Sequence, residues 1–170
     1  MKSLQLTPIS LCLPYVYSAI IVTGMKIQDS YNKPGLLPGY SGIERKKIII
    51  VDDDALLTKT IHMCLSKKGH DVKVSFTGAD AVRCLSEEKP DLLVLDIRLP
   101  DCNGWSLARL VEKRERAEKV PLIIISALEP DRERMAEVKP YAYIQKPFDM
   151  EQLIQTVERS LAGETSLACI

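Results

Sequence analysis

The sequence lacks net charge, since 23 Lys and Arg residues balance 23 Asp and Glu residues among its 170. A balanced chain has no overall field that draws it to nucleic acid or to anionic lipid. It also lacks the phosphate-binding glycine patterns G-x-G-x-x-G and G-x-x-x-x-G-K, and we find no internal repeat. These absences argue against binding through bulk charge or a nucleotide-binding glycine loop, so function depends on particular side chains.

The sequence has no C-x-x-C pair, and its cysteines are scattered. They are Cys12, Cys64, Cys84, Cys102 and Cys169. An odd number of scattered cysteines argues against a disulfide framework and against a zinc site, and it is typical of a reducing compartment. We therefore expect a cytoplasmic protein.

The apolar run near the start of the chain is too short to span a membrane. Ile9 to Val22 is apolar, but it has only 14 residues and contains Pro14, whereas a spanning helix needs about 20 residues. Lys2 precedes the run, so the stretch loosely resembles a secretory signal. No clear A-x-A cleavage site follows it.

Residues 1–44 differ in composition from the rest of the chain. Tyr31 to Gly42 is rich in Pro, Gly and Ser and is typical of a linker. We expect residues 1–44 to be a disordered segment or an incorrectly assigned start, with Met25 as the alternative first residue. A membrane-surface anchor formed by residues 1–25 stays open as an alternative, as does an unknown role.

Beyond Ile43, short apolar runs alternate with helical patterns. The five runs are Ile48–Val51, Val72–Phe76, Leu92–Leu95, Leu122–Ile125 and Tyr141–Ile144. The first, third and fourth lack polar alternation, which is typical of parallel strands covered on both faces, whereas the second alternates as an edge strand does. This order of elements predicts a doubly wound α/β domain with a five-stranded parallel sheet and helices on both faces.

Apolar residues at helical spacing mark the segments between the strands. The expected buried stripes are Leu56, Leu57, Ile61, Cys64 and Leu65; Ala81, Val82 and Leu85; Trp105, Leu107, Ala108, Leu110 and Val111; and Leu153, Ile154, Val157 and Leu161. Asp149, with Gln152 three residues later, predicts a capping box at the start of the last helix. Glu129 to Val138 predicts a weaker helix before the fifth strand.

Polar residues follow four of the predicted strands. Asp52 and Asp53 follow the first, Asp96 the third, Ser126 the fourth and Lys146 the fifth. The carboxyl ends of parallel strands lie at one edge of a sheet, and ligands bind there. We therefore expect the three acids to converge, with the hydroxyl and the ammonium group beside them.

Each of these residues alone has an ordinary structural explanation. A lone aspartate after a strand is usually a turn or cap residue, and Asp54 fits the start of a helix. A lone Lys-Pro pair usually belongs to a loop. The joint placement of these residues at successive strand ends is much harder to obtain by accident.

Four motifs resemble the receiver domain of two-component response regulators. They are "IIIVDDD", "PDLLVLDIRLPDCNG", "LIIISA" and "YIQKPF", within a segment from about Arg45 to Ala162 that covers about 70% of the chain. The resemblance implies the flavodoxin-like strand order 2-1-3-4-5. It also implies a receiver domain at residues 45–162, a short tail at 163–170 and a single-domain regulator of a two-component or phosphorelay system.

The resemblance implies a role for each residue of the site. Asp96 would be the phosphoacceptor, and Mg²⁺ would be bound by Asp53 and Asp96 directly, by Asp52 through water and by the main-chain carbonyl of Arg98. Ser126, the backbone N–H of Ala127 and Lys146 would contact the phosphoryl oxygens. These residue types suit the role, because a carboxylate can form an acyl phosphate when cations neutralise the incoming charge.

The resemblance also implies structural and switching residues. Pro100 would fix φ after the acceptor, Gly104 would adopt a conformation that a side chain forbids, and Lys146–Pro147 is a candidate cis peptide bond. On phosphorylation Ser126 would move toward the phosphate and Tyr143 would rotate into the vacated space. The face formed by the fourth helix, fifth strand and fifth helix would then change.

The sequence departs from the family pattern near this face. Only 20 residues separate Ser126 from Lys146, and "KPYAY" replaces the customary "GADDY", so we expect the fourth helix or its exit loop to be shortened. Arg98 and Leu128 occupy positions that tune phosphoryl lifetime in the family. We expect these bulky residues to restrict attacking water.

Competing functions are weaker. A haloacid dehalogenase-type hydrolase carries an Asp two residues after its nucleophile, where this chain has Arg98, and a degenerate receiver usually lacks an acid or the lysine. No helix-turn-helix segment follows Ala162, so we expect no direct binding to nucleic acid. His62 and His70 are expected to be surface or core residues. The expected partners are a histidine kinase or histidine phosphotransfer protein and a downstream protein target.

Overall fold

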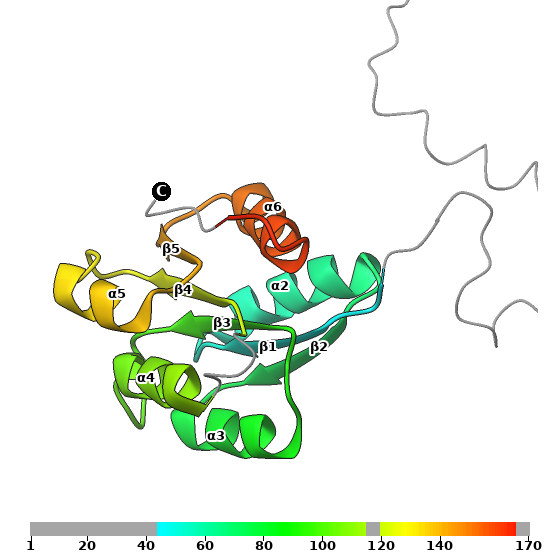
Figure 1. Cartoon of the computed structure of the whole chain (residues 1–170). Helices are drawn as coiled ribbons and strands as arrows, with labels where there is room; N and C mark the ends of the chain where they lie inside the picture. Colours follow the sequence, from blue (N-terminus) through cyan, green and yellow to red (C-terminus); the bar gives the residue numbers. More distant parts are fainter. Residues whose placement is uncertain (1–43, 115–119, 166–170) are drawn as a thin grey trace, which may run out of the picture. The chain divides into compact units, whose positions relative to one another are not determined.

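The computed structural model describes residues 44–114 and 120–165. Five strands and five helices alternate in this part of the chain (Figure 1). The strands are β1 (Lys47–Val51), β2 (Asp71–Ser75), β3 (Leu92–Asp96), β4 (Leu122–Ser126) and β5 (Ala142–Gln145). The helices are α2 (Ala55–Lys67), α3 (Gly78–Glu87), α4 (Gly104–Arg114), α5 (Arg132–Val138) and α6 (Met150–Leu161).

The five strands form one parallel sheet in the order β2-β1-β3-β4-β5, which confirms the predicted fold class and strand order. The register aligns Val51 of β1 with Leu95 of β3, and Asp96 of β3 with Ile125 of β4. The strands that end in acids are therefore neighbours at the centre of the sheet. This register brings the residues after β1, β3 and β4 to one edge.

Helices cover both faces of the sheet, as expected. On one face α2 and α6 pack on Ile48, Ile50 and the residues that share their direction, whereas α3, α4 and α5 pack on the opposite face with Ile49 and Val51 (Figure 1). The three central strands are buried along almost their whole length, because each face is covered. The continuous apolar runs in the sequence reflect this double coverage.

The prediction of burial is wrong for two residues, Leu56 and Val82. Leu56 has 76% of its surface exposed, and Val82 is 36% exposed. At about 100° per residue, Leu56 lies about 140° around α2 from the buried Ile61, whereas Leu57 lies about 40° from it. Val82 is likewise about 100° from the buried Ala81 and points away from the sheet.

The short helix α5 differs from its predicted bounds. It begins at Arg132, not at Glu129, because the Asp131 side chain accepts hydrogen bonds from the backbone N–H groups of Glu133 and Arg134 and caps the helix there. The helix ends at Val138, since Lys139 adopts a left-handed conformation with φ of 50°. With seven residues, α5 is the shortest of the five described helices.

Asp149 caps α6 by accepting from the backbone N–H of Glu151, which confirms the predicted helix start. The reciprocal bond from Gln152 that would complete the capping box stays a prediction. The apolar segment, linker and anchor predicted within residues 1–43 lie outside the described residues, and so does most of the predicted tail, residues 166–170. Among the residues that the structure describes, no helix combines the length and apolar character needed to cross a bilayer.

Candidate functional site

The predicted site residues meet at the carboxyl edge of the sheet. A cavity of about 390 Å³ opens there. Its lining comprises Asp52, Asp53, Asp54, Asp96, Arg98, Leu99, Pro100, Ala127 and Lys146. The structure therefore brings together the acids that follow β1 and β3 and the lysine that follows β5, although 94 positions separate Asp52 from Lys146 in the chain.

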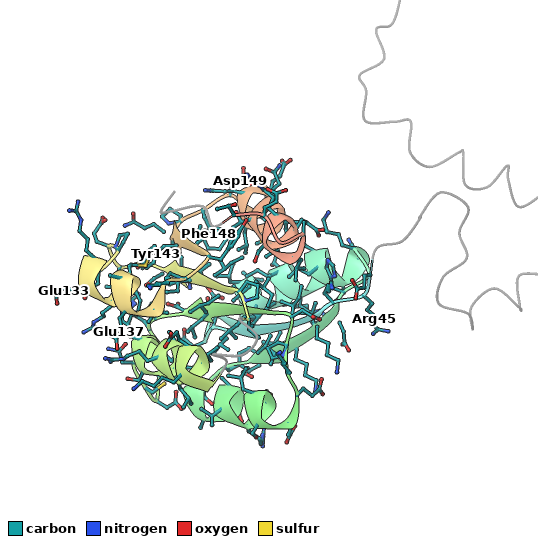
Figure 2. The ribbon with its side chains drawn as sticks, viewed as in Figure 1. Arg45, Glu133, Glu137, Tyr143, Phe148 and Asp149 are labelled. Atoms are coloured by element: carbon teal, nitrogen blue, oxygen red, sulfur yellow. The ribbon has the colours of Figure 1, made fainter. Side chains whose placement is uncertain are left out.

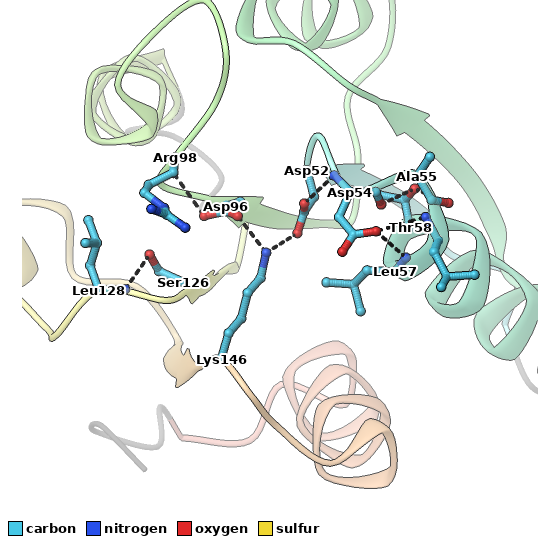
Figure 3. A network of polar contacts seen from close by, with 11 residues as sticks. Asp52, Asp54, Ala55, Leu57, Thr58, Asp96, Arg98, Ser126, Leu128 and Lys146 are labelled. Atoms are coloured by element: carbon cyan, nitrogen blue, oxygen red, sulfur yellow. Dashed lines mark hydrogen bonds and ion pairs between the residues drawn. The ribbon is translucent and has the colours of Figure 1, made fainter.

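Lys146 lies between two of the carboxylates (Figure 3). Its ammonium nitrogen is 2.6 Å from Oδ2 of Asp52 and 2.6 Å from Oδ2 of Asp96. The backbone N–H of Lys146 donates to the Ser126 carbonyl at 2.7 Å, which continues the β4–β5 pairing and fixes where the side chain starts. The Lys146–Pro147 peptide bond is cis, as the sequence analysis expected.

The three carboxylates form a donor set for a hard cation. One oxygen each from Asp52, Asp53 and Asp96 lies within 4.8 Å of the other two. Mg²⁺ binds oxygen at about 2.0–2.1 Å, so ligands on opposite sides of the ion are about 4.1 Å apart. The spacing is close to that requirement, and the donors are hard carboxylate oxygens, so these residues fit Mg²⁺.

Burial shapes the electrostatics of the cluster. Asp52 is fully buried and Asp96 is 4% exposed, whereas Asp53 is exposed. Loss of hydration raises the pKa of the Asp52 carboxyl above its ordinary value, although the hydrogen bond from Lys146 opposes this effect. Burial lowers the pKa of Lys146, but its bonds to Asp52 and Asp96 outweigh that and raise it overall. The lysine is therefore held as a cation among acids.

The third acid of the "DDD" run has a structural role. Oδ1 of Asp54 accepts from the backbone N–H groups of Leu56 and Leu57, which caps α2 (Figure 3). Oδ1 of Asp52 in turn accepts from the backbone N–H of Asp54 at 2.9 Å. The interpretation of Asp54 as a helix start is confirmed, and the cap also holds the Asp52 carboxylate in place.

The turn after Asp96 is held by short backbone contacts. The backbone N–H of Arg98 donates to Oδ1 of Asp96 at 2.9 Å, and that of Gly104 donates to the Ile97 carbonyl at 2.8 Å. The structure forbids a side chain at Gly104, as expected, although φ is not positive there. The reason is space: a Cβ there would lie 2.5 Å from the Asp96 carbonyl oxygen and 2.7 Å from Cα of Ile97.

Ser126 and Tyr143 lie outside the lining of the cavity. Ser126 is buried, and its hydroxyl accepts from the backbone N–H of Leu128 at 3.2 Å. Tyr143 is 1% exposed and lies on the α5 side of the molecule (Figure 2), where its hydroxyl donates to the Leu128 carbonyl at 2.8 Å. The tyrosine ring thus already occupies the interior in this structure, and its rotation stays a prediction.

An aromatic and cationic stack behind Tyr143 was missed by sequence reasoning. The rings of Trp105 and Tyr143 stack with centroids 6.5 Å apart and planes inclined by 21°. The guanidinium carbon of Arg134 lies 5.9 Å from the centre of the Trp105 ring. The helical spacing placed Trp105 on a buried face, but no signal in the sequence pairs it with the tyrosine 38 residues later.

The two histidines lie apart from the cluster. His70 is buried just before β2, at the opposite end of that strand from the site, with Nε2 3.3 Å from Oε1 of Glu158 on α6. His62 lies in the middle of α2. Both positions agree with the expectation of surface or core histidines.

Comparison with known proteins gives one family. The model of the response regulator receiver domain matches residues 48–158. Among solved structures, the BeF₃-activated N-terminal receiver domain of RstA from Klebsiella pneumoniae is 30% identical, with a TM-score of 0.59, and the match covers 68% of this chain and 97% of that one.

Two other receiver domains are similarly related. The non-phosphorylated HemR receiver domain from Leptospira biflexa is 29% identical with a TM-score of 0.64, covering 69% of this chain and 95% of that one. The receiver domain of Francisella response regulator 1452 is 27% identical with a TM-score of 0.62, covering 70% and 98%. Receiver domains are phosphorylatable signalling switches of two-component systems, which work between a phosphodonor kinase and downstream targets. This chain belongs to the response regulator receiver domain family.

Proposed function

We propose that Asp96 accepts a phosphoryl group from a phosphohistidine on a histidine kinase or histidine phosphotransfer protein, and that the phosphorylated form controls a protein partner. The observation that carries this proposal is the position of Asp96. Its carboxylate lies beside the ammonium group of Lys146 and within the cluster of Asp52 and Asp53, at the wall of an open cavity. Few arrangements other than phosphoryl transfer need an acceptor, a cation and a metal-binding pair together.

The reaction is a displacement at phosphorus. An Asp96 carboxylate oxygen forms a bond to the phosphoryl group, the P–N bond to the donor imidazole breaks, and the imidazole leaves with the electron pair and takes a proton. An acyl phosphate on Asp96 results. The backbone N–H of Arg98 holds Oδ1 of Asp96, which orients the carboxylate toward the cavity.

The charge of the transferred group must be neutralised. Asp52, Asp53, Asp96 and the main-chain carbonyl of Arg98 would hold Mg²⁺, with Asp52 acting through water. The chemistry that the bound ion supplies is neutralisation of charge on the phosphoryl oxygens. Lys146 supplies the second cation, and the backbone N–H of Ala127, which lines the cavity, can donate to an oxygen.

The output follows from a shift between two conformations. In this structure Leu128 joins Ser126 to Tyr143, because its N–H donates to the serine hydroxyl and its carbonyl accepts from the tyrosine. A phosphoryl group that draws the Ser126 hydroxyl toward the cavity would break the first bond. The face of α5, β5 and α6 would then change and bind the partner. Moving a 1:99 equilibrium to 99:1 takes about 5.5 kcal/mol.

The proposal is tested by direct phosphorylation. Wild type, Asp96→Asn and the matched control Asp131→Asn are incubated with Mg²⁺ and either acetyl phosphate or phosphoramidate, whose P–N bond resembles that of phosphohistidine. Intact mass is the readout. We expect one phosphoryl adduct on wild type and on Asp131→Asn, and none on Asp96→Asn or without Mg²⁺. An adduct on all three proteins, or on none, overturns the proposal.

A further inference from the structure

The loop between β3 and α4, residues 97–103, is fastened to the first turn of a different helix. Asp101 in this loop accepts two backbone hydrogen bonds from α3: Oδ1 accepts from Gly78 N–H at 2.8 Å, and Oδ2 accepts from Ala79 N–H at 2.9 Å. These two donors belong to the first turn of the helix, where backbone N–H groups have no partner within the helix. One carboxylate from the acceptor loop therefore satisfies both.

This contact is separate from the helix's own cap. Thr77 precedes α3, and its hydroxyl accepts from the backbone N–H of Asp80 at 3.1 Å. The loop and the helix also pack closely. A Cβ added at Gly78 would collide with Sγ of Cys102. The two backbone hydrogen bonds hold the pKa of the Asp101 carboxyl below its ordinary value, so it binds α3 as an anion.

The same loop is closed on itself beside the phosphoacceptor. Arg98 and Asn103 form an antiparallel bridge, and the side-chain oxygen of Asn103 accepts from the backbone N–H of Trp105 at 3.0 Å. At the end nearest Asp96, the backbone N–H of Arg98 donates to Oδ1 of the acceptor. The loop thus has one end on the acceptor carboxylate and its tip on α3.

We propose that Asp101 is a positioning residue for the chemistry at Asp96. By fastening the loop tip to α3, it holds the main chain of Arg98 against the acceptor, and so sets both the direction of the Asp96 carboxylate and the place of the Arg98 carbonyl. This inference rests on the proposed function. Residues that orient metal ligands without touching the ion change metal affinity or activity by about 10–100-fold when they are replaced.

A merely structural role for Asp101 predicts different results. If Asp101 only caps α3, its loss should resemble the loss of Thr77, whose hydroxyl caps the same turn by accepting from the backbone N–H of Asp80. The experiment therefore compares Asp101→Ala and Asp101→Asn with Thr77→Ala. Asp131→Asn on α5 is a second control, because Asp131 also accepts two backbone N–H bonds at a helix start but has no role in the site.

Three measurements separate the roles. Urea unfolding gives stability, amide hydrogen exchange at Arg98 in the metal-free protein reports the loop, and a Mg²⁺ titration followed by tryptophan fluorescence gives the affinity. We expect Asp101→Ala to weaken Mg²⁺ binding by about tenfold and to slow phosphorylation of Asp96 by a similar factor. Exchange at the Arg98 amide becomes faster. Asp101→Asn has one acceptor oxygen in place of the two carboxylate oxygens that each accept an N–H bond, and it carries no negative charge, so it should lie between wild type and Asp101→Ala.

The controls decide the outcome. Thr77→Ala should lower the midpoint of urea unfolding, whereas Asp131→Asn, which keeps an Oδ1 that can accept both bonds, should leave it nearly unchanged. Both variants should leave the Mg²⁺ affinity, the Arg98 exchange and the phosphorylation rate within a factor of about two of wild type. The inference is overturned if Thr77→Ala changes these properties as much as Asp101→Ala, or if Asp101→Ala and Asp101→Asn leave them unchanged while wild type is phosphorylated on Asp96. Phosphorylation that persists in Asp96→Asn overturns the proposed function instead.

Discussion

The ammonium nitrogen of Lys146 lies 2.6 Å from a carboxylate oxygen of Asp96 and thus occupies part of the space that a metal ion would share. Asp52, Asp53 and Asp96 carry three negative charges when ionised, and Lys146 carries one positive charge, so the four groups have a formal charge of −2. A dication cancels that charge. On the proposed function, the lysine and Mg²⁺ would therefore compete for the same oxygens, although phosphoryl transfer would need both.

Replacing Lys146 should separate metal binding from phosphorylation. Because Lys146→Met removes a competing cation, we expect Mg²⁺ to bind roughly tenfold more tightly, which corresponds to about 1.4 kcal/mol. The rate of phosphorylation by acetyl phosphate should fall on the order of a hundredfold, because one group that stabilises the phosphoryl oxygens is lost. Lys67→Met, at the far end of α2, is the control for loss of charge. Weaker Mg²⁺ binding in Lys146→Met contradicts this competition.

As the pH is lowered, the affinity for Mg²⁺ should begin to fall at a higher pH than it would if Asp52 had the pKa of an ordinary aspartate. The metal binds the deprotonated carboxylates, and burial raises the pKa of Asp52 above 3.8, so protons compete with the metal at a higher pH. Titrations from pH 8 down to the ordinary range of carboxyl groups test this, and Asp52→Asn should bind more weakly but lose that part of the pH dependence. An affinity that stays constant down to the ordinary range of carboxyl groups contradicts the prediction.

The same pKa shift has a consequence for stability without metal. The folded-state pKa of Asp52 is raised, so its contribution to the free energy of unfolding is fully present below the unfolded value of 3.8 and is lost as pH rises through the folded value. At neutral pH the metal-free protein therefore carries the cost of a buried charge. Addition of Mg²⁺ should raise the melting temperature more at neutral pH than at pH 5.

The meeting of polar residues at the strand ends was predictable from the sequence, because two simple rules apply to buried parallel strands. Strands covered on both faces are continuous apolar runs, and parallel strands end at one edge, so the convergence of Asp52, Asp96 and Lys146 needs no side-chain detail. Helix faces were less certain. Leu56 and Leu57 are equally apolar, and only the angle of α2 against the sheet decides that the first is exposed.

Contacts between distant segments could not be predicted. The Trp105–Tyr143 stack depends on how α4 packs against the sheet, and the two bonds that Asp101 accepts from α3 depend on the path of a loop. For Gly104, the sequence indicated that a side chain would be harmful, but only the structure shows that the reason is the nearby backbone of Asp96 and Ile97.

Gly104→Ala should therefore destabilise the protein and disturb the acceptor. The new Cβ meets backbone atoms that cannot move easily, and such overpacking costs about 1–3 kcal/mol of the free energy of unfolding. Phosphorylation should slow as well, because Asp96 itself must shift. Gly69→Ala is the matched control: φ is 97° there and no atom lies near the added Cβ, so we expect a cost of about 1 kcal/mol with no change in phosphorylation. Equal phosphorylation rates in both variants contradict the prediction.

Fluorescence of Trp105 should report the switch directly. It is the single tryptophan of the chain, and its ring stacks on Tyr143, whose hydroxyl is bonded to the Leu128 carbonyl. We expect acetyl phosphate, added with Mg²⁺, to change the emission of wild type. In Asp96→Asn, acetyl phosphate should cause no change beyond the one that Mg²⁺ causes by itself.

Tyr143→Phe tests the connection to Leu128. The variant keeps the ring against Trp105 but loses the hydroxyl bond, so we expect a loss of about 1 kcal/mol in the free energy of unfolding and a smaller fluorescence change on phosphorylation. Intact mass must show equal phosphorylation of the two proteins. If the emission then changes as much in Tyr143→Phe as in wild type, the hydroxyl does not carry the signal.

The lifetime of the phosphorylated form should depend on Arg98 and Leu128, which follow Asp96 and Ser126 by two positions each. Arg98 is exposed and lines the cavity, and Leu128, 44% exposed, begins the loop after Ser126 and Ala127 (Figure 3). Hydrolysis requires a water molecule to reach phosphorus opposite the Asp96 oxygen, and bulky groups on that side reduce its access.

Replacing both residues with alanine should shorten the half-life of phosphorylated Asp96 severalfold, with each single variant between the double variant and wild type. The half-life is measured by intact mass after removal of the phosphodonor. Leu56→Ala is the control, because Leu56 is an exposed leucine on α2, outside the turn that follows Asp96 and the loop that follows Ser126. A double variant that loses its phosphoryl group at the wild-type rate shows that these side chains do not limit water, and that the lifetime is set instead by groups that contact the phosphoryl oxygens.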